Sequence, residues 1–202
     1  MRRMVLAALL MAAPPAQAEE APEMRGLYLQ LIHQARADGR SRAALAYLDD
    51  FERRYPDDAE ARLLRVNSLI DLGQIDAAEA VVLPADAQGA NAVRGHLLAA
   101  RGHWVEAADR YAGAVEDSPA DPLLRNALGY ALLRAGLAAR AIEALRGAID
   151  LAPQEAVIRN NLLLALMVAG HRAEAETGLR SIGDPALRRT LAAEAARIGK
   201  GG

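Results

Sequence analysis

A short signal for the end of a helix recurs along the chain at nearly constant spacing. Five glycines lie 34, 29, 34 and 34 residues apart, and an alanine follows each of them by five residues: Gly39, Gly73, Gly102, Gly136 and Gly170. Three prolines follow a glycine of this series by 17 residues: Pro56, Pro119 and Pro153. Because proline has no backbone N–H group, it ends a helix. The repeated unit is therefore predicted to be a helix, a glycine turn, a second helix and a proline turn.

Apolar residues recur at spacings of three and four between these signals, which is typical of helices that bury one face. No segment shows the alternation that marks a half-buried strand. A single helix pair cannot bury both of its faces, so such pairs gain stability by stacking on one another. The chain has 202 residues, of which 52% are apolar, and is long enough for such a stack. We predict an all-α fold.

The repeats resemble the tetratricopeptide family at the positions where that family carries fixed small and large residues. Residues 122–155 match its pattern at Leu128, Gly129, Ala141, Ala148 and Pro153. Residues 88–121 match it at Gly95, Trp104, Ala107, Tyr111, Ala114 and Pro119, and residues 25–58 at Tyr28, Leu31, Gly39, Ala44, Leu48, Phe51 and Pro56. The resemblance implies a right-handed α-solenoid of helix-turn-helix repeats.

This resemblance divides the chain into five units: 25–58, 59–87, 88–121, 122–155 and 156–183. The second unit is degenerate, because it is five residues short and carries Pro84 early in its second helix, which predicts a truncated helix or a loop. Residues 184–198 are predicted to form a capping helix at the open end of the stack, followed by a tail at 199–202.

The N-terminus is typical of a secretory signal peptide. Arg2 and Arg3 precede an apolar run of about ten residues, and a small-x-small sequence ends at Ala18. Since that run is about half as long as a membrane span, we predict cleavage after Ala18 rather than an uncut anchor. Residues 1–18 would then be removed, and residues 19–24 would form a short linker. The mature protein is expected to be periplasmic and to lack a transmembrane segment.

The family resemblance also implies a binding groove. In arrays of this type the first helix of each unit lines a concave face, through fixed positions of that helix. Transferred to this chain, those positions predict a groove for a protein or peptide segment, lined by Asn67, His96, Asn126, Tyr130, Leu133, Arg134, Asn160, Leu164 and Val168. Asparagine side chains both donate and accept, so Asn126 and Asn160 could bond the main chain of an extended peptide.

Two alternatives concern the same residues. The asparagines could instead bridge neighbouring helices or bond water. Some tetratricopeptide grooves bind terminal carboxylates with Lys and Arg beside Asn, but the single Lys of this chain, Lys200, is in the tail, and Arg134 is the main groove cation of the C-terminal half. The composition therefore disfavours a carboxylate clamp of that kind.

The sequence offers little to other classes of function. The chain contains no Cys, which excludes disulfides, thiolate metal sites and a cysteine nucleophile. Its formal net charge of −2 and its 3% aromatic content argue against a nucleic-acid partner. His33 and His96 would face the groove two units apart, too far for a shared metal, and His103 and His171 follow glycine turns, where a solvated polar residue is ordinary. No nucleophile elbow, phosphate-binding loop or zinc-protease motif is present. We expect no cofactor, no metal and no enzymatic activity.

Residues 157–175 suggest a more specific context. Their sequence, V-I-R-N-N-L-L-L-A-L followed by a turn at Gly170, resembles a segment of the TadD-like repeat proteins that assist assembly of Flp pili, the tight-adherence secretion system. The resemblance implies an adaptor for the envelope part of a pilus machine. Members of that group are often lipoproteins, from which this chain departs by having no Cys. A general periplasmic adaptor for outer-membrane assembly, cytochrome maturation or cell-wall enzymes is the alternative, and an enzyme with an unrecognised groove site is a remote one.

Overall fold

The structure, a computed structural model, describes residues 17–85 and 87–200, with side chains from Glu23 onward. The predicted signal peptide, apart from its last two residues, lies outside the described residues. Within the described part the regular structure is entirely helical: α1 (Gln17–Ala37), α2 (Ser41–Arg54), α3 (Ala59–Asp71), α4 (Ile75–Glu79), α5 (Ala90–Ala100), α6 (Trp104–Asp117), α7 (Pro122–Arg134), α8 (Ala138–Leu151), α9 (Ala156–Val168), α10 (Arg172–Ser181) and α11 (Pro185–Ile198).

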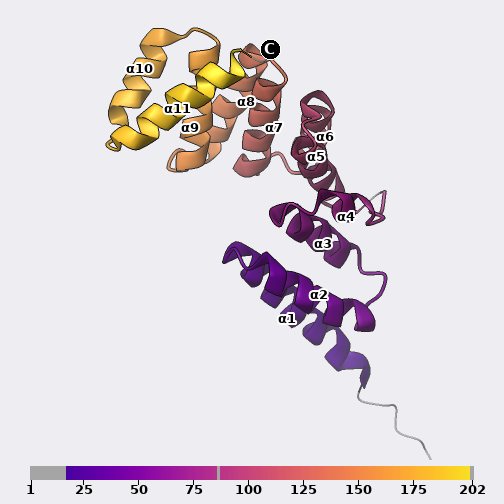
Figure 1. Ribbon diagram of the computed structural model, residues 1–202. Helices are drawn as coiled ribbons and strands as arrows, with labels where there is room; N and C mark the ends of the chain where they lie inside the picture. Colours follow the sequence, from indigo (N-terminus) through magenta and orange to yellow (C-terminus); the bar gives the residue numbers. More distant parts are fainter. Residues whose placement is uncertain (1–16, 86, 201–202) are drawn as a thin grey trace, which may run out of the picture.

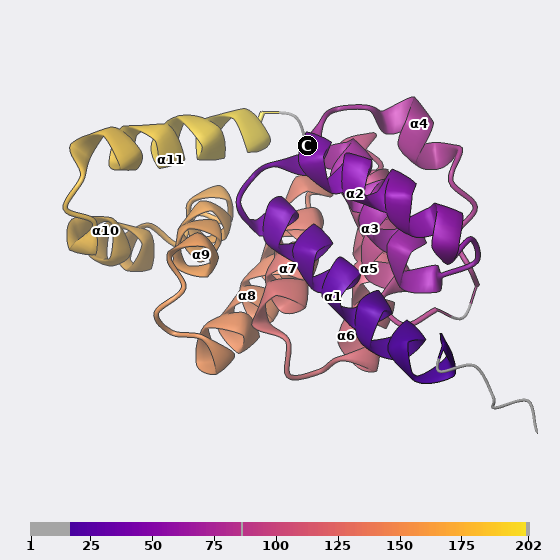
Figure 2. The same cartoon turned by 90° about the horizontal axis from the view of Figure 1, so that it is seen from below.

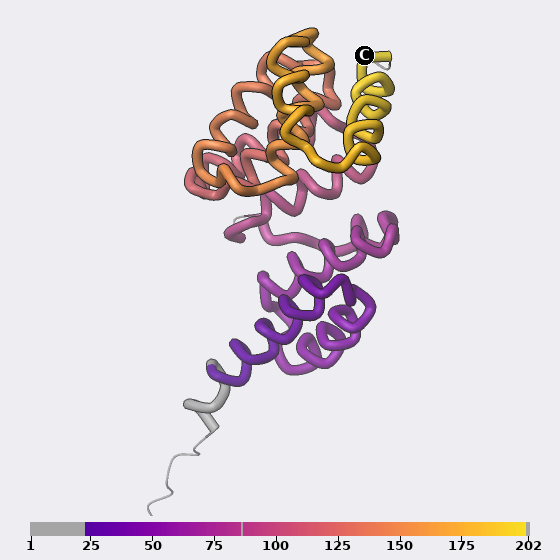
Figure 3. Tube along the Cα trace, turned by 90° about the vertical axis from the view of Figure 1, so that its left-hand side faces the viewer, coloured from indigo at the N-terminus to yellow at the C-terminus, as the bar shows by residue number. Residues whose placement is uncertain are grey.

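Consecutive helices pair and the pairs stack into a curved array, as the sequence predicted (Figure 1). The first helix of each unit packs on the second helix of the unit before it, as α7 does on α6 and α9 on α8. In Figure 3 the α1–α2 pair and the α9–α11 helices form opposite ends of the array. This is the architecture of an α-solenoid, in which each unit is stabilised by its neighbours.

The helix boundaries follow from local chemistry. The five glycines of the repeated turn all have positive φ, between 70° and 81°, a conformation that side chains with a Cβ rarely adopt. Asp58, Asp121 and Asp184 each accept a hydrogen bond from a backbone amide in the first turn of the next helix. Such N-caps contribute about 0.5–2 kcal/mol each. The turns of the array are therefore encoded unit by unit.

Glycine also allows paired helices to approach closely. A Cβ atom at Gly95 of α5 would lie 2.7 Å from the Tyr111 ring, and one at Gly129 of α7 would lie 2.5 Å from Leu145 Cγ. Tyr111 and Leu145 are buried in the largest apolar core, which extends from α6 to α11. In both pairs the large side chain of the second helix occupies the space that the glycine of the first helix leaves free.

The second unit is incomplete. Its second helix, α4, has five residues, and an irregular segment containing Pro84 leads from it to α5. The Arg101 guanidinium ties α4 to the end of α5 through Asp76, at 2.5 Å, and Glu79, at 2.6 Å. The apolar residues of α3, α4 and α5 form a small core of their own, separate from the cores on either side.

The linker prediction for residues 19–24 was wrong, because α1 begins at Gln17 and includes them. Alanine and glutamate favour helix, and Glu19, Glu20 and Ala21 extend it toward the N-terminus.

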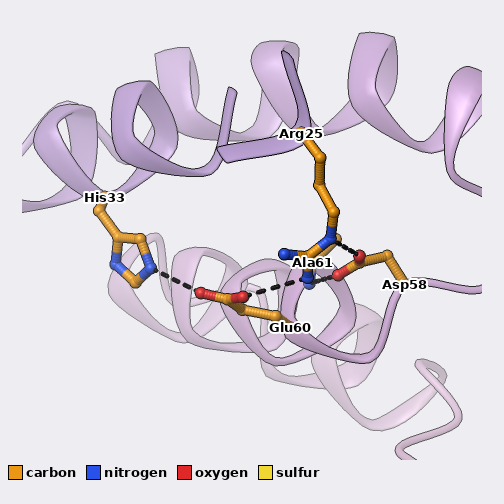
Figure 4. Close-up of polar contacts among 5 residues, drawn as sticks. All are labelled: Arg25, His33, Asp58, Glu60 and Ala61. Carbon is orange, nitrogen blue, oxygen red and sulfur yellow. Dashed lines mark hydrogen bonds and ion pairs between the residues drawn. The ribbon is translucent and has the colours of Figure 1, made fainter. Parts of the chain in front are cut away.

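Farther along α1, an ion pair holds this helix to the unit that follows (Figure 4). Arg25 Nε donates to Asp58 at 2.6 Å, and its Nη2 to Glu60 at 3.2 Å. Burial acts to raise the pKa of Asp58, but the hydrogen bonds from Arg25 and from the Ala61 amide outweigh it and leave that pKa below its ordinary value.

We predict that replacement by alanine affects stability differently at two glycines that lie inside neighbouring helices, Gly147 of α8 and Gly129 of α7. A Cβ at Gly147 of α8 would meet the Arg125 side chain at an ordinary 3.7 Å, whereas one at Gly129 would overlap the buried Leu145. Both Gly→Ala changes gain the same helix propensity, so their difference isolates the overlap. Gly129→Ala should be less stable than Gly147→Ala by about 1–3 kcal/mol in urea unfolding. Equal stabilities would contradict the close approach of α7 and α8.

Candidate protein-binding groove

The first helices of the last three units line a cleft of about 390 Å³. Its walls come from α5, α6, α7 and α9: Ala99, Trp104, Tyr111, Asn126, Ala127, Tyr130, Ala131, Asn161 and Leu164. Asn161 Nδ2 donates to Asn126 Oδ1 at 2.8 Å and so links α9 to α7 across the cleft. The volume of the cleft falls within the range of about 300–1,000 Å³ that is usual for ligand pockets. We call this cleft, with the neighbouring Arg134, the groove.

An aromatic and cationic stack forms one end of the groove. The Trp104 and Tyr130 rings meet edge to face, with centroids 6.0 Å apart. The Arg134 guanidinium carbon lies 4.2 Å from the centroid of the Trp104 ring, and Arg134 Nη1 donates to the Tyr130 hydroxyl at 3.2 Å. Stacking of this kind contributes about 0.5–2 kcal/mol. It fixes the orientation of the guanidinium group.

Arg134 has no carboxylate partner among the residues that the structure describes. Many other arginines are paired, as Arg146 is with Glu174 at 2.9 Å. An oriented guanidinium group without a counter-charge is well suited to bind a carboxylate from outside the chain.

The C-terminal helix borders the groove at this end. Glu194, Arg197 and Ile198 of α11 line a cavity of about 210 Å³ together with Trp104 and Arg134. Glu194 is ion-paired with Arg197 of the same helix. The chain therefore places the end of its own last helix beside the part of the groove that carries Arg134.

Some of the predicted groove residues lie elsewhere. The prediction was wrong for Leu133, which is 0% exposed, because α7 packs on α6, α8 and α9 and this residue is part of their common core. Leu164 is 4% exposed and lines the cleft, and Val168 is half-buried against the same core.

Asn160 also departs from the prediction, since it does not share the cleft of Asn126. It lines a second, larger cavity of about 650 Å³ between α9 and α10, whose walls are mostly apolar. Its neighbour Asn161 faces Asn126 instead. One residue along a helix is a rotation of about 100°, so the family's fixed positions selected the wrong asparagine of the pair. The bridge between Asn126 and Asn161 is the alternative that the sequence had left open.

In the N-terminal half of the array the predicted residues bond each other. His96 Nδ1 lies 2.9 Å from Asn67 Oδ1, which joins α5 to α3, and the His96 ring packs against Tyr111 with centroids 5.6 Å apart. Both side chains are half-buried. His33 lies near Glu60, with 3.2 Å between Nε2 and Oε1, so it faces the α1–α3 contact and not His96.

Sequence reasoning missed Trp104 and Asn161 as groove residues. Trp104 had been assigned to the repeat pattern alone, although it is the single tryptophan of the chain and follows a glycine turn closely. Asn161 stands beside Asn160, and only the rotation of α9 decides which of the two faces α7. The position of α11 beside Arg134 had no signal in the sequence.

The described residues also bear on metal sites and membrane spans. No cluster of three or more potential metal ligands occurs within residues 23–85 and 87–200. None of the helices in the described part of the chain combines the length and apolar character needed to cross a bilayer.

Comparisons with known proteins agree with this architecture. Two models of the tetratricopeptide repeat match residues 35–101 and 93–156. Comparison with curated protein sequences finds no match.

Three solved structures illustrate the likeness of fold. The thermophilic tetratricopeptide protein TTC0263 of Thermus thermophilus has a TM-score of 0.68 at 21% identity, over 84% of this chain and 98% of that one. PilF of Pseudomonas aeruginosa has a TM-score of 0.65 at 18% identity, over 90% and 86%. MamA of Desulfovibrio magneticus has a TM-score of 0.58 at 23% identity, over 79% and 97%.

The repeat models and the fold together define the class of this chain. It is built of tetratricopeptide repeats and is an α-solenoid scaffold of the type that binds protein or peptide partners. The identities to the solved structures are all below 25%, so they establish the fold alone.

We predict that His96 makes the stability of the array depend on pH. Burial lowers the pKa of His96 below its ordinary value, and Arg36 adds to this effect, whereas Asp71 opposes it. Below about pH 6.5 the unfolded chain therefore binds more protons than the folded one, and stability falls as pH falls, by at most about 1.4 kcal/mol per pH unit for one proton. We compare the free energies of unfolding of the wild type and of His96→Gln in urea between pH 7.5 and 5. The wild type should lose more stability than His96→Gln as the pH falls. A difference that stays constant with pH would contradict it.

Proposed function

We propose that this protein is an exported, non-enzymatic adaptor that binds a segment of a partner protein in the groove. The observation that carries the proposal is Arg134, a cation oriented by Trp104 and Tyr130, without a carboxylate partner in the described residues, at the end of a cleft large enough for a ligand. A buried or half-buried cation is usually paired, so one held open in a groove favours a ligand that supplies the opposite charge.

The remaining walls of the groove suit a polypeptide. Asn126 and Asn161 each use one side-chain atom in their mutual hydrogen bond, which leaves the Asn126 amide group and the Asn161 oxygen for a ligand main chain or side chain. Leu164, Ala127 and Ala131 provide apolar surface between these polar groups. A mostly apolar cleft with a few fixed polar groups is the usual form of a specific binding site.

Export is proposed from the sequence alone. The order of basic, apolar and small residues up to Ala18 supports a cleaved signal peptide and a periplasmic location. Edman sequencing or intact mass measurement of the protein from an envelope fraction should then give Glu19 as the first residue. A mature chain that still begins at Met1 would contradict the proposal of export by cleavage.

Pilus assembly is the specific context that we propose. The support is the resemblance of residues 157–175 to the repeat proteins of the Flp system. In this role the groove would hold a segment of a pilus or secretion component during assembly. A general envelope adaptor remains the alternative.

The groove can be tested by exchanging one arginine at a time. The partner would first be captured from envelope extracts with tagged protein and identified by mass spectrometry, and its affinity would then be measured by calorimetry. Arg134→Ala should weaken binding at least about tenfold, because it removes a charge-assisted contact. Arg140→Ala removes an equally charged side chain from the exposed face of α8 and should leave the affinity unchanged. Equal affinities of the two variants would overturn the groove proposal.

A further inference from the structure

The last helix does not complete the stack in the way that the earlier helices do. In the complete units before it, the first helix packs on the second helix of the preceding unit, as α7 does on α6 and α9 on α8. Helix α11 instead packs mainly on α9, with few contacts to α10. Figures 1 and 2 show it running from the end of α10 past α9. The last turn of α11 lines the cavity that contains Trp104 and Arg134, so this end of the helix lies beside the groove.

Among the residues that the structure describes, apolar side chains hold α11 in this place. Leu191 and Ala195 are buried, at 6% and 8% exposure, and Leu187 and Ile198 are partly buried in the same core. The hydrogen bonds and ion pairs of its described side chains stay inside the helix or its cap, as in the pair of Glu194 with Arg197. Other neighbouring helices are joined by polar contacts, such as α8 to α10 through Arg146 and Glu174.

The charges at the end of α11 are a poor match for the groove. Glu194 is the carboxylate that this helix brings to the cavity beside Arg134, and Arg197 of the same helix already neutralises it. The cavity thus holds two guanidinium groups and one carboxylate, and Arg134 keeps no counter-charge from α11. A helix with the same apolar face and a carboxylate free to reach Arg134 would fit this site better than α11 does.

We propose that α11 is a detachable occupant of a helix-binding site, and that the partner segment is an amphipathic helix with the apolar spacing of α11 and an acidic residue that pairs with Arg134. The spacing is that of Leu187, Leu191, Ala195 and Ile198, which is the spacing of anchors that lie along one face of a helix. This inference rests on the proposed function and names its ligand as a helix, because a helix of the chain itself already ends beside Trp104 and Arg134. Displacement of α11 exposes the surface that the partner covers.

Competition by α11 makes the inference testable with a defined probe. The short tether between α10 and α11 keeps α11 at an effective concentration of about millimolar, so wild-type protein should bind an added helix weakly. The probe is a fluorescent peptide with the sequence of residues 184–200, measured by anisotropy. Full-length Leu191→Asp, which loses the main apolar anchor of α11, should bind this peptide at least about tenfold more tightly than the wild type does. Ala193→Asp, an equal charge on the exposed face of α11, should behave like the wild type.

A second peptide tests the role of charge. Replacing Arg197 of the peptide by Ala frees Glu194, so this peptide should bind the Leu191→Asp protein severalfold more tightly than the first peptide does. The gain should disappear when the protein also carries Arg134→Ala, because the freed carboxylate then has no partner. A gain that is independent of Arg134 would overturn the pairing that we propose.

A measurement on the wild-type protein guards against a variant that fails to fold. Hydrogen exchange should show that amides of α11 exchange faster than those of α9, and that saturating peptide speeds exchange in α11 further. If exchange in α11 is as slow as in α9 and the peptide does not change it, α11 is a fixed part of the fold and the inference is overturned. That result would not affect the adaptor proposal, which is tested separately by comparing the affinities of Arg134→Ala and Arg140→Ala for the captured partner.

Discussion

The close contact between a glycine of one helix and a large side chain of its partner determines how the two central units, α5–α6 and α7–α8, are built. At Gly129 the α7 backbone comes so near to α8 that Leu145 fills the place of a side chain, and Gly95 has the same relation to Tyr111. Helices that approach in this way bury their facing residues almost completely, as Leu145 at 0% exposure shows. Two such units in succession fix the positions of α5 to α8. These helices hold Asn126, Tyr130 and Arg134 of α7 in place.

The second unit illustrates the consequence of losing one helix of a pair. Helix α4 has five residues, so in the preceding unit α5 contacts α3 more than α4. Arg101 bonds Asp76 and Glu79 at the surface where a longer helix would supply apolar contacts. Exposed ion pairs contribute little, about 0–1 kcal/mol each. The small separate core around α4 is therefore the place where the two halves of the array are least strongly joined. The complete units α5–α8, and with them most of the groove, lie on the C-terminal side of this junction.

The repeat pattern of the sequence was sufficient to predict the all-helical fold, because glycine turns and proline breaks act locally. The site was harder to predict, because it depends on the rotation of each helix. Asn160 and Asn161 differ in sequence by one position, and only the packing of α9 decides that Asn161 faces Asn126. Leu133 satisfies the family's groove position and yet is buried, since α7 packs there on α6, α8 and α9. The placement of α11 depends on contacts between distant residues and has no local signature.

The last unit explains why α11 leaves the regular stack. It carries Leu163 where the two units before it carry Gly129 and Gly95, and the space between its helices is made at Gly178 instead, where a Cβ would overlap Leu163 Cδ2. Helix α10 is short and mostly exposed, with Ala175 as its one buried residue among those described, and a cavity of about 650 Å³ remains between it and α9. Such a helix offers little apolar surface to a following one, whereas α9 buries Ile158 and Leu163–Leu166 in the core. An amphipathic helix at this end of the chain gains most by packing on α9, and α9 is a wall of the groove. The short, exposed α10 thus leaves α9 as the surface on which α11 packs, and the last turn of α11 comes to lie beside Arg134.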